Sequence, residues 1–163
     1  MTPLPSAEAL HRFGGHALTE VLLAWLQFPA TELVSGSEPA TPPEPALLIT
    51  VTWHGDTLSG AVQLVVPDAF ANHAAQVLLG SDGAPPTDAL RRDLCGELAN
   101  MVAGRIAADL RSAGHHSTLG TPTVQPVSFP FADEAHPLGT TFTAWSCQGF
   151  PIGLHVRCQP SPA

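Results

Sequence analysis

Three polar side chains, Asp93, Glu97 and Asn100, recur at helical spacing within the stretch DLCGELANMVAGRIAADL. At about 100° per residue they lie on one side of a helix, opposite an apolar stripe that is suited to a core. That stripe consists of Cys95, Leu98, Val102, Ile106 and Leu110. An asparagine amide both donates and accepts hydrogen bonds, as the positioning of a water molecule requires. The pattern predicts a helix face whose carboxylates and amide are offered to another molecule.

Small residues accompany these side chains on the same face, namely Gly96, Gly104 and Ala107. Each glycine inside a helix costs about 1 kcal/mol relative to alanine. Small residues beside functional ones allow the backbone of another molecule to come close. A solvated helix face with one Asp, one Glu and one Asn is also common, so face geometry alone leaves an ordinary exposed surface open.

The order Asp93-x3-Glu97-x2-Asn100, followed further along by Pro122 in LGTPTV, resembles the signature of the CheC/CheX chemotaxis phosphatases. The text ELANMVAG and the preceding order of hairpin and amphipathic helix are similar as well. The likeness extends over roughly residues 7–159, and the gap between Asn100 and Pro122 is slightly shorter than in the family.

The first predicted helix has His16, Glu20 and Leu23 at the corresponding positions. A leucine stands where a second asparagine would be needed. We therefore expect one active face rather than two, which resembles CheX more than two-site CheC.

This resemblance implies a phosphatase that hydrolyses the aspartyl phosphate of a CheY-like receiver domain. The receiver would supply its own Mg²⁺ and lysine, so no cofactor of the chain itself is expected. Asn100 would orient the attacking water and Glu97 would pair with the receiver lysine. Asp93 would serve docking, and together with Gly96, Gly104 and Pro122 it forms the expected partner-binding set.

Two alternatives remain open at this point. A non-catalytic CheC-like module could bind a receiver or a flagellar partner without hydrolysis, and a small-molecule sensor could share the fold. The sequence has no GxSxG, no phosphate-binding glycine loop before a lysine and no HExxH motif. His115 and His116 are adjacent and lack a third ligand at helical spacing, so no metal site is expected.

The charge balance excludes several kinds of partner. The net charge is −8, with six arginines and no lysine, so no basic patch is available for nucleic acid or an anionic membrane. No apolar run approaches the roughly 18 residues that span a bilayer, and the start lacks a signal-peptide pattern. We expect a cytoplasmic protein whose Cys95, Cys147 and Cys158 are reduced and structural.

Periodicity and turn residues predict the elements that position the motif. Helices are expected at 7–28, 69–79 with Asp68 as N-cap, and 88–113 with Gly114 as the stop; strands at 31–36, 47–53, 58–66, 118–127, 140–147 and 152–158. Residues 39–46 are rich in proline and predict a surface loop, and residues 160–163 predict a frayed tail.

The two halves share one order of elements, a long helix, a short strand and then a hairpin. This indicates an internal duplication within a single domain, residues 1–163. We expect an α+β fold in which long helices cover one face of an antiparallel sheet. An edge strand rich in β-branched residues could pair with its copy in a homodimer.

Overall fold

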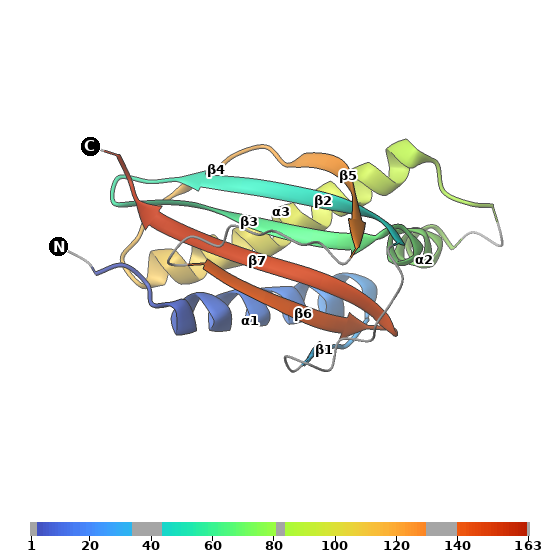
Figure 1. The fold of residues 1–163 in the computed structure, drawn as a ribbon, viewed down its shortest axis with the longest axis horizontal. Helices are drawn as coiled ribbons and strands as arrows, with labels where there is room; N and C mark the ends of the chain where they lie inside the picture. Colours follow the sequence, from blue (N-terminus) through green and yellow to red (C-terminus); the bar gives the residue numbers. More distant parts are fainter. Residues whose placement is uncertain (1–2, 34–43, 81–83, 130–139, 163) are drawn as a thin grey trace.

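The computed structural model describes residues 3–33, 44–80, 84–129 and 140–162. Within them, three helices pack on a seven-stranded antiparallel sheet (Figure 1). In chain order the elements are α1 (Ala7–Leu26), β1 (Ala30–Leu33), β2 (Glu44–His54), β3 (Leu58–Pro67), α2 (Asp68–Leu79), α3 (Asp88–Ser112), β4 (Thr118–Leu119), β5 (Thr123–Phe129), β6 (Thr140–Cys147) and β7 (Phe150–Pro160).

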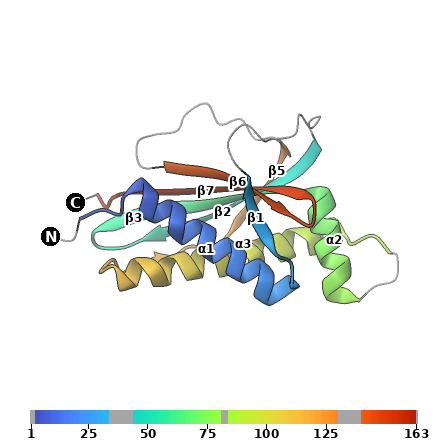
Figure 2. The same cartoon turned by 90° about the horizontal axis from the view of Figure 1, so that it is seen from below.

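The sheet order confirms the predicted duplication. The strands are arranged β1-β6-β7-β3-β2-β4, and β5 also pairs with β2. Exchanging β1 with β4 and β5, β2 with β6, and β3 with β7 gives the same order read backwards. The two long helices α1 and α3 lie side by side on one face of the sheet (Figure 2). The α+β architecture with helices on one face is therefore confirmed.

The long helices begin and end where the sequence supplies the appropriate caps. The Ser6 hydroxyl accepts a hydrogen bond from the amide of Ala9, and the Thr87 hydroxyl accepts one from the amide of Leu90. Gly114, with a φ of 92°, follows α3 and ends it as predicted. Gly14 and Gly15 bring α1 close to the sheet, since a Cβ at Gly14 would lie 2.9 Å from Val156. The caps thus set the ends of both long helices, and the two glycines allow α1 to pack closely on the sheet.

Three local predictions are wrong. Pro67, not Asp68, caps α2; Asp68 is the first helical residue and accepts a hydrogen bond from Arg91 Nη1 at 3.1 Å. Residues 44–46 are not loop, because they pair with β5 and so begin β2, whereas residues 34–43 lie outside the described part. The tail is held as far as Ser161, whose hydroxyl donates to the carbonyl of Gly55.

The strand predicted over 118–127 is split in two. β4 pairs with β2 only at Leu119 and Thr118, and β5 resumes the pairing at Thr123. Residues 120–122 between them belong to neither strand. Pro122 has no N–H to donate to a ladder, and Gly120 weakens a strand interior. This break places residues 119–122 beside the middle of α3.

Candidate functional site

The structure largely confirms the predicted division of α3 into a buried apolar side and an exposed polar side. The residues of the apolar stripe are fully buried, and Asp93 and Glu97 are exposed. Asn100 is half-buried, at the boundary between the packed side of α3 and solvent. The Asp/Glu/Asn stripe therefore lies where a second molecule could reach it.

The small residues of this face divide into two kinds. Gly96 and Ala107 are buried, contrary to expectation, while Gly104 is half exposed. A Cβ added at Gly96 would lie 3.9 Å from the Cβ of Pro122, so Gly96 packs against the break between β4 and β5. An added Cβ at Gly104 meets nothing within 4 Å. Gly96 thus serves packing within the chain, and Gly104 leaves open space in front of α3.

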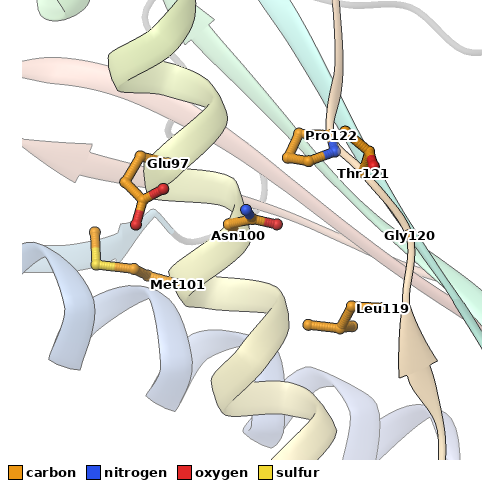
Figure 3. A pocket seen from close by; sticks show the side chains of 7 residues that line it. All are labelled: Glu97, Asn100, Met101, Leu119, Gly120, Thr121 and Pro122. Atoms are coloured by element: carbon orange, nitrogen blue, oxygen red, sulfur yellow. The ribbon is translucent and has the colours of Figure 1, made fainter.

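A hollow of about 480 Å³ lies between α3 and the segment 119–122. It is lined by Glu97, Asn100, Met101, Leu119, Gly120, Thr121 and Pro122. In Figure 3, Asn100 and Leu119 point into the space between the helix and this segment, and Glu97 projects about one turn earlier from the side of α3 that carries Met101. The structure therefore brings together Glu97, Asn100 and Pro122, whereas Asp93 does not line the hollow.

Sequence reasoning missed four residues of the lining, Met101, Leu119, Gly120 and Thr121. A signal was present in LGTPTV, because a glycine and a proline two residues apart interrupt a run that otherwise reads as a strand.

Backbone contacts with β2 set the position of the segment. The Gly120 amide donates to the carbonyl of Thr52 at 2.8 Å. A Cβ at position 120 would lie 2.6 Å from the hydroxyl oxygen of Thr52, so glycine permits this close approach. The far wall of the hollow is thereby attached to the sheet.

Arg92 connects the same segment to α3. Its Nη1 donates to the carbonyl of Val124 at 3.3 Å, and its Nε donates to Asp88 at 2.7 Å. The hydrogen bond from Arg92, helped by the charges of Arg92 and Arg91, holds the pKa of Asp88 below its ordinary value of 3.8. Asp88 is therefore ionised at neutral pH and keeps the guanidinium directed toward β5.

We expect Arg92→Ala to loosen the segment without unfolding the chain. A net contribution of about 1 kcal/mol for such a hydrogen bond corresponds to roughly fivefold faster amide exchange in residues 120–124. Hydrogen–deuterium exchange measures this directly, with Arg111→Ala at the exposed end of α3 as the matched control. Equal exchange in the two variants would show that Arg92 does not hold the segment.

The three cysteines are free thiols, and none offers a nucleophile. Burial raises the pKa of Cys95 and of Cys158 to about 12 and that of Cys147 to about 11. A thiol with such a pKa remains protonated at neutral pH and is unreactive. Cysteine-based phosphoryl transfer is therefore excluded at these positions.

The adjacent histidines His115 and His116 have different surroundings. His115 is buried and contacts the carbonyl of Pro3 at 3.1 Å and the hydroxyl of Thr57 at 3.2 Å, whereas His116 is exposed. Across the described residues, no three His, Cys, Asp or Glu side chains are grouped so that they could hold a metal ion. Every helix within the described ranges is too short or too polar to cross a lipid bilayer.

The corresponding face of α1 differs from that of α3 in its charges. The Glu20 carboxylate pairs with Arg105 Nη2 at 2.6 Å and with His16 Nε2 at 3.2 Å, and Leu23 is exposed. Glu97, in contrast, has no ion-pair partner in the described part of the chain. Of the two related carboxylates, the one beside Asn100 is available to a cation of another molecule.

Comparison with known proteins gives a family match for the part of the chain that contains this site. Residues 47–126 match the family model described as chemotaxis phosphatase CheX. No curated protein matches the sequence. Chemotaxis protein CheX from Vibrio vulnificus is similar in structure, with a TM-score of 0.75, 18% identity, and coverage of 96% of this chain and 100% of that one.

Two further solved structures share the fold. A CheC-like superfamily protein from Shewanella sp. PV-4 has a TM-score of 0.72 at 18% identity, over 92% of this chain and 97% of that one. The complex of CheX with CheY, BeF3 and Mg²⁺ from Borrelia burgdorferi has a TM-score of 0.67 at 14% identity, again over 92% and 97%. The chain therefore has the CheX/CheC-like fold, and its residues 47–126, which include the whole motif from Asp93 to Pro122, match the chemotaxis phosphatase CheX family.

Proposed function

We propose that this protein is a phosphatase that hydrolyses the aspartyl phosphate of a CheY-like receiver domain. The observation that supports it most is the open hollow lined by both Asn100 and Glu97, a carboxylate that has no ion-pair partner among the described residues. The match to the CheX family and the fold shared with a CheX that was solved together with CheY agree with such a partner.

The proposed reaction requires few chemical groups from this protein. Water attacks phosphorus in line with the aspartyl oxygen, the bond between phosphorus and that oxygen breaks, and inorganic phosphate and the free aspartate are released. The receiver brings the Mg²⁺ and the lysine that neutralise charge on the phosphoryl group, so this protein needs no cofactor of its own. Catalysis then depends on orienting the water and on electrostatic positioning.

Asn100 is the catalytic residue in this proposal. Its carbonyl oxygen accepts a hydrogen bond from the water, and its NH₂ group donates to a phosphoryl oxygen, so one amide aligns both reactants. Asn100 is half-buried and lies inside the helix α3, so the backbone from which its amide projects is held in place. No general base is required of the chain.

Glu97 provides the docking charge. Its exposed carboxylate pairs with the receiver lysine one turn before Asn100, which sets the register of the helix on the receiver. Gly104 allows the receiver backbone to approach α3, and Pro122 with Gly96 forms the packed wall behind the amide. Asp93 contributes at the edge of the interface.

The test is phosphate release from a phosphorylated receiver domain encoded in the same genome. We expect the protein to accelerate release well above spontaneous loss, in the presence of Mg²⁺ and at catalytic concentrations. A protein that binds phosphorylated receivers yet never exceeds spontaneous loss would instead be the non-catalytic interaction module.

Gly104→Ala distinguishes an effect on stability from an effect on receiver binding. We expect the substitution to make the protein more stable and its binding to the receiver weaker. The added methyl meets nothing in the free protein, so we expect the free energy of unfolding to rise by about 1 kcal/mol. The same methyl would obstruct the receiver backbone and weaken binding several-fold.

Urea unfolding measures the change in stability, and titration with the receiver measures the change in binding. Ala108→Gly, which removes a methyl group from the same helix instead of adding one, is the control. A Gly104→Ala protein that is more stable and binds equally well would remove Gly104 from the interface.

A further inference from the structure

A second hollow, of about 350 Å³, lies between α1 and α3. It is lined by Glu20, Val21, Ala24, Trp25, Met101 and Arg105. Four of these six side chains are apolar, and the two charged ones pair with each other at 2.6 Å. A hollow whose charges are already paired favours an apolar occupant over a charged one.

This hollow adjoins the candidate site at Met101. Met101 lines both hollows, one toward the segment 119–122 and one toward α1. Methionine is flexible and polarisable, and such side chains adapt to partner surfaces.

The dimensions determine which partner would cover it. Asn100 and Arg105 are five residues apart on α3, about 7.5 Å along the helix axis. A stable protein interface buries roughly 800 Å² on each partner, a patch about 30 Å across. An interface of this size that is centred on Asn100 and Glu97 extends about 15 Å in each direction and therefore reaches the hollow on the α1 side of Met101.

We propose that the hollow between α1 and α3 is a second contact for the same receiver domain, occupied by an apolar side chain of the receiver next to its phosphorylation site. This inference rests on the proposed function. In this proposal α1, which has a leucine where α3 has Asn100, contributes to receiver binding and not to hydrolysis. The contact sets affinity and partner choice, whereas Asn100 sets the rate of hydrolysis.

Filling the hollow tests the proposal. Ala24 is exposed on α1, so Ala24→Gln fits the helix and places a longer side chain across the opening. We expect KM for the phosphorylated receiver to rise about tenfold, equivalent to about 1.4 kcal/mol, with kcat changed less than twofold. Ala113→Gln, an exposed position at the end of α3, is the matched control and leaves both parameters unchanged.

Trp25 gives an independent measure of occupancy. It is half-buried in the hollow, while Trp53 and Trp145 are buried in the core, so receiver docking should change mainly the emission of Trp25. We expect a shift on titration with a receiver without tryptophan, lost in Trp25→Phe and displaced to higher receiver concentration in Ala24→Gln.

The outcomes distinguish this inference from the proposed function. If the protein binds the receiver with the Trp25 signal but releases no phosphate, the phosphatase function fails and the docking inference holds. If phosphate is released normally and Ala24→Gln leaves KM and emission unchanged, the docking inference is overturned and the function stands. Absence of any receiver binding overturns both.

Discussion

Asn100→Ala is expected to reduce receiver dephosphorylation by on the order of 100-fold, because misplacing a reacting group by about 1 Å already has an effect of that size. The loss should appear in kcat, with little change in receiver affinity, since the amide acts on the water and Glu97 on docking. Single-turnover phosphate release at saturating protein measures kcat separately from binding.

The fold should survive this substitution. Asn100 is half-buried, and its side chain has no hydrogen-bond partner in the described part of the chain. Alanine is also a better helix former than asparagine by about 0.6 kcal/mol. The unfolding midpoint should therefore stay equal or rise slightly.

Asp93→Ala is the matched control for Asn100→Ala, since Asp93 lies two turns earlier on the same face but outside the hollow. We expect it to lower the rate less than threefold. If Asn100→Ala retained the rate of the unmodified protein while Asp93→Ala lost it, the assignment of the water-orienting residue would be wrong.

Glu97→Gln is expected to weaken receiver binding about tenfold and to lower the rate of hydrolysis as well. The substitution preserves shape and removes the charge, so it tests the pairing with the receiver lysine, for which a charge-assisted hydrogen bond is worth about 1.5–3 kcal/mol. Because Glu97 has no ion pair within the described residues, neutralising it should leave the free protein as stable as before.

Ionic strength provides the diagnostic for Glu97. Docking through a rim charge becomes weaker as salt rises, and this dependence should flatten in Glu97→Gln. Glu8→Gln, an exposed carboxylate in the first turn of α1, makes the same change of charge away from the hollow and should keep the salt dependence. Parallel salt curves for the two variants would refute the pairing.

The sequence by itself determined the parts of this protein that depend on local periodicity. The stripe from Cys95 to Leu110 is buried as its spacing required, because a helix period of 3.6 leaves no other way to hide those side chains. The same spacing places Glu97 and Asn100 on the opposite side of the helix. The repeated order of helix, strand and hairpin predicted the symmetric order of strands in the sheet.

Only the tertiary structure decided how the motif becomes a site. Gly96 and Pro122 are distant in the chain, and they meet because the break in the expected strand at residues 120–122 lies beside α3, where the bond from the Gly120 amide to Thr52 attaches it to β2. Likewise, Glu20 pairs with Arg105 of the neighbouring helix, while Glu97 has no ion-pair partner in the part of the chain that the structure describes. Such contacts join residues whose proximity depends on how the helices and the sheet pack, and no periodicity within one element contains that information.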